Sequence, residues 1–69
     1  MKNKLKELRS NSGITQEQLA EHLGVSRQTV ISIESGRYNP SIILAYKMAR
    51  LFNCSIEEVF DFSEVELGE

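Results

Sequence analysis

The chain has 69 residues, 41% of them hydrophobic and 26% charged, which is typical of one small globular domain and argues against disorder. Its net charge of −2 is unevenly distributed along the chain. Residues 1–50 carry eight basic and four acidic side chains, whereas residues 51–69 carry six acidic and no basic ones. No apolar stretch approaches the roughly 18 residues of a membrane span or forms a signal peptide, and the lone Cys54 excludes an internal disulfide, so we expect a cytoplasmic protein without a membrane partner.

Five short helices are predicted from capping and helix-ending residues, which makes the expected fold all-α. The first covers about residues 2–12 and ends at Gly13, since glycine suits the left-handed position just past a helix end. The second begins at Thr15, which forms a Thr-x-x-Gln capping box with Gln18, and ends at Gly24. The apolar residues at helical spacing in these two helices, which we expect to face the core, are Leu5, Leu8, Leu19, Ala20 and Leu23.

Three further helices are predicted in the second half of the chain. Ser26 caps the third helix, which ends at Gly36, and Ser41 caps the fourth after a loop. Asn53 can end the fourth in the left-handed conformation, and a second capping box at residues 55–58 opens the fifth. The residues of these helices that we expect to face inward are Val30, Ile33, Ile42, Ala45, Met48, Ala49, Phe52, Ile56, Val59 and Phe60.

An acidic and apolar tail follows the fifth helix. Polar and apolar side chains alternate at residues 60–62 and again at 65–67, which is a weak signal for a short C-terminal strand. We therefore divide the chain into a domain of residues 1–60 and a tail of residues 61–69. The basic domain could face phosphates while the tail points away, and the alternative is a solvated tail that only aids solubility.

The strongest motif covers about residues 16–35. Only Gly24-Val25-Ser26 separates the second helix from the third, and so short a turn makes two helices cross steeply, as in a helix-turn-helix. Ala20 is small enough for the crossing point, and Gly24 tolerates the positive φ that the turn requires. The motif therefore predicts a helix-turn-helix in the domain of residues 1–60.

The run ITQEQLAEHLGVSRQTV at residues 14–30, with its continuation IESGRYNPS at residues 33–41, resembles the lambda-repressor-like, or Xre-type, helix-turn-helix regulators. The resemblance extends over about residues 3–60 and is strongest to very short bacterial and archaeal members. It implies a five-helix DNA-binding domain with the third helix in the major groove of double-stranded DNA. In such proteins the start of that helix contacts base edges while the preceding helix crosses the backbone.

The exposed face of the third helix supplies the expected base contacts. With Val30 and Ile33 facing inward, the helical period turns the opposite residues outward. The predicted base contacts are Arg27, Gln28, Thr29, Ile31 and Ser32. Arg27 can pair bidentately with guanine and Gln28 with adenine, whereas Ser32 is shorter than the residue that many relatives carry at its position. The alternative is an exposed helix face without a function.

Phosphate contacts are expected from Thr15 and Gln16, where free N–H groups at a helix start attract anions. The resemblance places the loop of Arg37, Tyr38 and Asn39 along the DNA backbone, and we add Ser35 to this set. The alternative for Tyr38 is packing beneath the loop. The resemblance also implies a structural ion pair between Arg9 and Glu34.

A single domain of this size buries too little surface for tight specific binding, so we expect a homodimer that reads two half-sites about 34 Å apart. The predicted dimer contacts are the apolar residues near the C-terminus, namely Phe60, Phe62, Val65 and Leu67. They could add a short strand to a symmetry mate. The alternative is that Phe60 and Phe62 only close the core of one chain.

These features favour a homodimeric transcriptional regulator, in the first place a repressor, that binds an operator. The alternatives are the DNA-binding antitoxin of a toxin–antitoxin pair and a protein-interaction module that has lost DNA binding. No motif for catalysis, a cofactor or a small-molecule ligand is evident. His22 is alone on a polar face and lacks the further ligands that a metal site needs.

Overall fold

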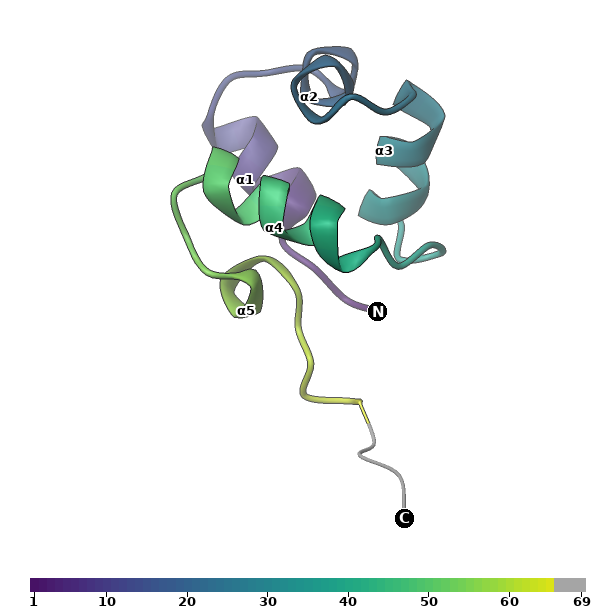
Figure 1. Cartoon of the computed structure of the whole chain (residues 1–69), viewed down its shortest axis with the longest axis vertical. Coiled ribbons are helices and arrows are strands. Elements are labelled where there is room, and N and C mark those ends of the chain that lie inside the picture. Colours follow the sequence, from purple (N-terminus) through teal and green to yellow (C-terminus); the bar gives the residue numbers. More distant parts are fainter. Residues whose placement is uncertain (66–69) are drawn as a thin grey trace.

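A computed structural model describes residues 1–65 and consists of five short helices (Figure 1). They are α1 (Leu5–Asn11), α2 (Gln16–Leu23), α3 (Arg27–Glu34), α4 (Ile42–Leu51) and α5 (Ile56–Val59). The prediction of an all-α, five-helix fold is therefore confirmed. Over residues 1–65, no helix is both long and apolar enough to cross a membrane.

Side-chain caps begin four of the five helices at the residues expected from the sequence. Thr15, Ser26, Ser41 and Ser55 each accept a hydrogen bond from the backbone N–H three residues later. In the capping box of α5, the carboxylate of Glu58 accepts a hydrogen bond from the backbone N–H of Ser55, and this bond lowers the pKa of Glu58. Each cap satisfies an N–H group that helix geometry leaves without a partner.

The core is formed where α1, α4 and α5 meet the α2–α3 pair. Figure 1 shows α4 crossing in front of α1, with α2 and α3 at one side and α5 at the other. α2 packs most extensively against α3, and the small Ala20 is buried there. The fully buried large side chains are Leu5, Leu19, Val30, Ile33, Met48 and Val59. Burial of such residues is the main stabilising contribution in a domain of this size.

The first helix begins later than predicted, because residues 1–4 pair with the segment that follows α5. Asn3 and Phe60 form an isolated antiparallel bridge, the N–H of Lys4 donates to the carbonyl of Val59 at 2.7 Å, and that of Asp61 donates to the carbonyl of Lys2 at 2.9 Å. The predicted strand signal at residue 60 thus corresponds to one bridge within the chain, and residues 1–65 contain no strand. Leu67, at the end of the predicted alternation at residues 65–67, lies outside the described residues.

One predicted core residue is on the surface. Ile42 was expected to face inward, but it is 71% exposed. The remaining α4 residues of that stripe, Ala45, Met48 and Ala49, are buried, and Phe52 packs against the core. Periodicity identifies the buried stripe of a helix but not how far its first turn projects beyond the neighbouring helices.

The turn between α2 and α3 depends on Gly24, whose φ is 73°. We expect Gly24→Ala to destabilise the protein by about 1 kcal/mol, because a Cβ is strained in this conformation although it would meet no neighbouring atom. Gly24→Asn should cost less, since asparagine tolerates positive φ, as Asn53 does at 56°. Urea unfolding of the two variants measures the difference, and an alanine variant as stable as the asparagine variant would contradict the explanation.

Candidate nucleic-acid interface

The outward face of α3 presents the five predicted base-contacting residues with different degrees of exposure. Arg27 and Gln28 in the first turn are exposed, whereas Thr29, Ile31 and Ser32 are half-buried. The hydroxyl of Thr29 lies 3.0 Å from that of Ser26, so it takes part in the cap of the helix. The two long, flexible polar side chains therefore lie at the start of α3 and are exposed to solvent.

A shallow hollow lies beside this face. It is lined by Ser26, Gln28, Thr29, Ser32 and Tyr38. Tyr38 comes from the loop after α3 and is 50% exposed. The hollow brings three of the predicted base-contacting residues together with one from the set predicted to contact phosphates.

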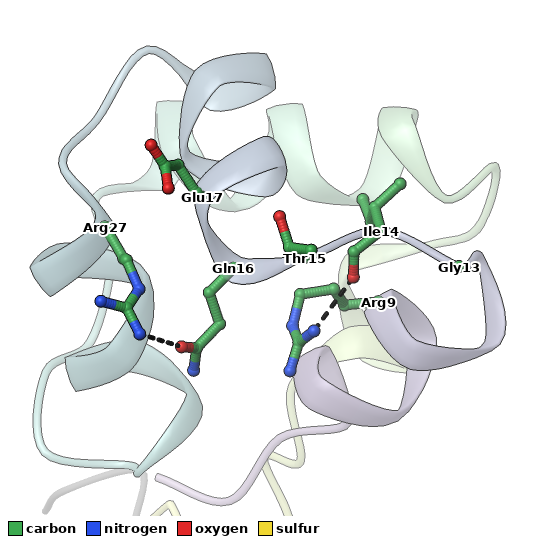
Figure 2. Close-up of a pocket in the computed structure, with 7 residues that line it drawn as sticks. All are labelled: Arg9, Gly13, Ile14, Thr15, Gln16, Glu17 and Arg27. Carbon is green, nitrogen blue, oxygen red and sulfur yellow. Dashed lines mark hydrogen bonds between the residues drawn. The ribbon is translucent and has the colours of Figure 1, made fainter.

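The start of α2 lies directly beside Arg27 (Figure 2). The guanidinium Nη2 of Arg27 donates to the Oε1 of Gln16 at 3.5 Å, which is a long and weak hydrogen bond. Thr15, Gln16 and Arg27 line the same surface pocket. The first N–H groups of α2 have no partner within the helix and attract anions, and the pocket beside them is lined by both Arg27 and the acidic Glu17.

A nearly buried carboxylate connects three helices behind this surface. Glu34 at the end of α3 has a side chain only 5% exposed and pairs with the Nε of Arg9 from α1 at 2.7 Å. Its Oε1 also accepts a hydrogen bond from the Nε2 of Gln16 at 3.1 Å. Arg9 in turn donates from Nη1 to the carbonyl of Ile14 at 3.0 Å. Gln16 therefore lies between Glu34 and Arg27.

The loop that follows α3 presents Arg37, Tyr38 and Asn39 to solvent. The backbone N–H groups of Arg37 and Tyr38 donate to the carbonyl of Ser32 at 3.0 and 3.2 Å, which folds the loop back along α3. The hydroxyl of Ser35 donates to the same carbonyl at 3.0 Å. The loop residues predicted to contact phosphates are thus exposed, and the backbone of the loop is anchored to α3.

Asn3 anchors the end of α3 from the other side, and the sequence analysis did not identify it. Its Nδ2 donates to the carbonyl of Ile33 at 2.8 Å, and its Oδ1 accepts from the N–H of Leu5 at the start of α1. An asparagine just before a helix is a recognised cap signal, but its bond to Ile33 spans 30 residues and no local pattern predicts it.

The described residues offer no competing site for a metal. No group of three or more histidine, cysteine or acidic side chains in residues 1–65 could hold a metal ion. His22 is exposed on α2, and Cys54 is half-buried at the start of α5, where desolvation raises the pKa of its thiol.

The sequence profile of the helix-turn-helix family matches residues 5–59, which include all five helices. The chain belongs to this family. The family includes the Xre, or lambda-repressor-like, type. HTH-type transcriptional regulators of this type match the chain over nearly its full length. One from Archaeoglobus fulgidus is 51% identical over 100% of this chain and 97% of its own length. One from Methanocaldococcus jannaschii is 53% identical over 96% of this chain and 100% of its own length.

Solved structures support the same fold for this helix-turn-helix regulator. The crystal structure of the restriction-modification controller protein C.AhdI from Aeromonas hydrophila is similar, with a TM-score of 0.73 and 36% sequence identity. The match covers 81% of this chain and 85% of that protein. The chain is therefore a DNA-binding helix-turn-helix transcriptional regulator.

Removal of the Glu34 carboxylate should be strongly destabilising for this regulator. We expect Glu34→Ala to lower the free energy of unfolding by about 3 kcal/mol, because the buried Arg9 guanidinium loses its counter-charge. The double variant Arg9→Ala/Glu34→Ala should recover part of that loss, since it leaves no unpaired charge. Urea denaturation of the two single variants and the double variant measures the coupling, and additive losses would contradict an ion pair of this strength.

Proposed function

We propose that this regulator binds double-stranded DNA as a homodimeric repressor, with α3 of each copy in the major groove. The observation that supports this most directly is the exposed pair of Arg27 and Gln28 at the start of α3, immediately beside the start of α2. These side chains can make bidentate contacts with guanine and adenine. In this proposal the shorter side chains of Thr29, Ile31 and Ser32 contact bases along the same face of α3.

Phosphate contacts in this proposal flank the base-reading face on two sides. On one side, the N–H groups at the start of α2 meet the backbone near Thr15 and Gln16. On the other side, Arg37 and its loop neighbours reach the backbone of the adjacent strand. Arg27 can leave its weak bond to Gln16 when a base replaces it as partner, because a hydrogen bond of 3.5 Å contributes little to stability. Contacts on both sides would set the register of α3 in the groove.

We expect a dimer because one copy buries too little surface on DNA for tight binding and because typical operators have two-fold symmetry. Two half-sites about one helical turn apart give the affinity that one α3 does not supply. Of the four predicted tail contacts, Phe62 and Val65 are exposed, and Leu67 lies outside the described residues. Phe60 is 3% exposed and packs in the core of its own chain, as the alternative for this residue anticipated. Repression requires only that the bound dimer overlap a promoter and exclude polymerase.

Selection from a random duplex library tests the proposed function. We expect enrichment of a two-fold-symmetric site with half-sites about one helical turn apart, and affinity that falls steeply between two salt concentrations. A transcription assay on a promoter that contains the selected site should then show lower output with protein added. Selection of no site would contradict DNA reading by α3, and higher output would contradict repression.

Alanine substitutions should separate base reading from phosphate binding. We expect Arg27→Ala and Gln28→Ala to weaken binding to the selected site by about 10- to 100-fold and to relax its sequence preference. Arg37→Ala should weaken binding to all duplexes alike and lower the salt dependence by the equivalent of about one phosphate contact. Fluorescence anisotropy on matched and scrambled duplexes measures both effects. Lys6→Ala on α1 is the control for loss of one exposed positive charge, and an equal effect at Lys6 would contradict these assignments.

A further inference from the structure

The hollow beside α3 joins a residue of the following loop to the outward face of that helix. It has a volume of about 280 Å³ and is lined by Ser26, Gln28, Thr29, Ser32 and Tyr38. None of these five side chains carries a charge, and Tyr38 contributes the single aromatic ring. The hollow is therefore an uncharged feature on the face that enters the major groove in the proposed function.

The hydrogen bonds of the loop hold Tyr38 beside Ser32. The backbone N–H of Tyr38 donates to the carbonyl of Ser32 at 3.2 Å, so the side chain of Tyr38 begins next to residue 32. The backbone N–H of Arg37 donates to the same carbonyl at 3.0 Å, which fixes the loop at a second point. Ser32 is half-buried and short, so it leaves open the space that a longer side chain at this position would occupy. Tyr38 thus lies beside a position from which α3 itself reaches only a short distance.

The side chains of the hollow suit an apolar group better than a phosphate. The hydroxyls of Ser26 and Thr29 lie 3.0 Å apart, and the Oγ of Ser26 also accepts the N–H of Thr29, so both belong to the cap of α3. The ring of Tyr38 and the methyl group of Thr29 are the apolar groups of the lining. The cationic side chain of the loop, Arg37, does not line the hollow. A phosphate would therefore find no side-chain counter-charge there, whereas an apolar group would leave water on contact with the ring.

An apolar group of this kind is available in the major groove, because thymine presents its C5-methyl group there. We propose that Tyr38 reads a thymine, with the C5-methyl group of the base in the hollow against the ring. This inference rests on the entry of α3 into the major groove in the proposed function. It moves Tyr38 from the predicted phosphate contacts to the base contacts, and it leaves Arg37 and Asn39 as the phosphate contacts of the loop.

The spacing along α3 sets where this thymine lies in a half-site. Ser32 is four residues beyond Gln28, which is about 6 Å along the helix axis, and successive nucleotides of one DNA strand are about 3.4 Å apart. We therefore expect the thymine one or two base pairs from the adenine that Gln28 contacts. Tyrosine has only two side-chain torsions to fix, so this contact has a low cost in conformational entropy.

Removal of single methyl groups from the DNA tests this inference. Each thymine of the selected site is replaced in turn by deoxyuridine, which lacks only the C5-methyl group, and affinity is measured by fluorescence anisotropy. We expect the unmodified chain to lose about 4-fold in affinity at one thymine of each half-site, which is the effect of burying one methyl group. Tyr38→Ala should bind the thymine and deoxyuridine duplexes equally. Tyr38→Phe keeps the ring and should retain the difference.

Two further variants are the controls. Arg37→Ala changes the neighbouring residue of the same loop and should weaken binding to both duplexes alike, with their ratio unchanged. Thr29→Ser keeps the hydroxyl of the α3 cap and removes only a methyl group. Loss of the thymine preference in Thr29→Ser, together with a full preference in Tyr38→Ala, would assign the methyl contact to α3 alone and overturn the inference. Far-ultraviolet circular dichroism should show the same helix content in all variants.

The remaining outcomes separate failure of this inference from failure of the proposed function. Uniform weakening of Tyr38→Ala on all duplexes, with the preference for thymine retained, would return Tyr38 to the phosphate contacts and overturn the inference, while base reading by α3 would stand. Unchanged binding by Tyr38→Ala, or equal affinity of the unmodified chain for every thymine and deoxyuridine pair, would overturn it as well. If the unmodified chain selects no site at all, the proposed function is refuted, and the inference with it.

Discussion

The ion pair between Arg9 and Glu34 is the interaction on which the DNA-facing geometry depends. A carboxylate that is almost fully buried is tolerated only when it is paired and hydrogen-bonded, and Glu34 obtains its partners from α1 and from the first residue of α2. Because the one carboxylate of Glu34 binds both Arg9 of α1 and Gln16 of α2, the end of α3 is tied to both helices. The same pairing places Gln16 next to Arg27, so that the start of α3, which we propose reads bases, adjoins the start of α2, which we propose meets phosphates.

The N-terminal segment supports the same surface from behind. Residues 1–4 do not extend α1 but run along the end of α3, where Asn3 binds the carbonyl of Ile33 and the terminal ammonium of Met1 donates to the carbonyl of Gly36 at 3.3 Å. Gly36 has a φ of 81°, and a Cβ there would lie 3.2 Å from the carbonyl oxygen of Met1. Glycine is therefore favoured by the backbone conformation, and any larger residue would also require Met1 to shift. The loop that presents Arg37 is held between the carbonyl of Ser32 and the N-terminus.

The apolar residues of this small chain fall into two groups with different consequences. Those at the meeting point of the five helices are fully buried and account for the stability of the monomer. Those on the outer side of α4 are exposed, although a domain this small has little apolar area to leave in water. Exposed apolar residues that are neighbours on one helix are typical of a surface that contacts another molecule.

Much of this organisation is determined by the sequence alone, because it depends on local chemistry. The caps at Thr15, Ser26, Ser41 and Ser55, the left-handed turn at Gly24 and the stripe of Val30 and Ile33 are each specified within a few residues, and they predict both the five helices and the exposed face of α3. Only the tertiary structure decided which apolar residues at the ends of elements are buried. Ile42 projects past its neighbours into solvent, whereas Phe60 is enclosed because residues 1–4 pair beside it. The bonds of Asn3 to Ile33 and of Gln16 to Glu34 were decided in the same way, since hydrogen bonds between residues 30 and 18 positions apart depend on how helices pack and leave no periodic signal in the chain. The Arg9–Glu34 ion pair, in contrast, was implied by the family resemblance.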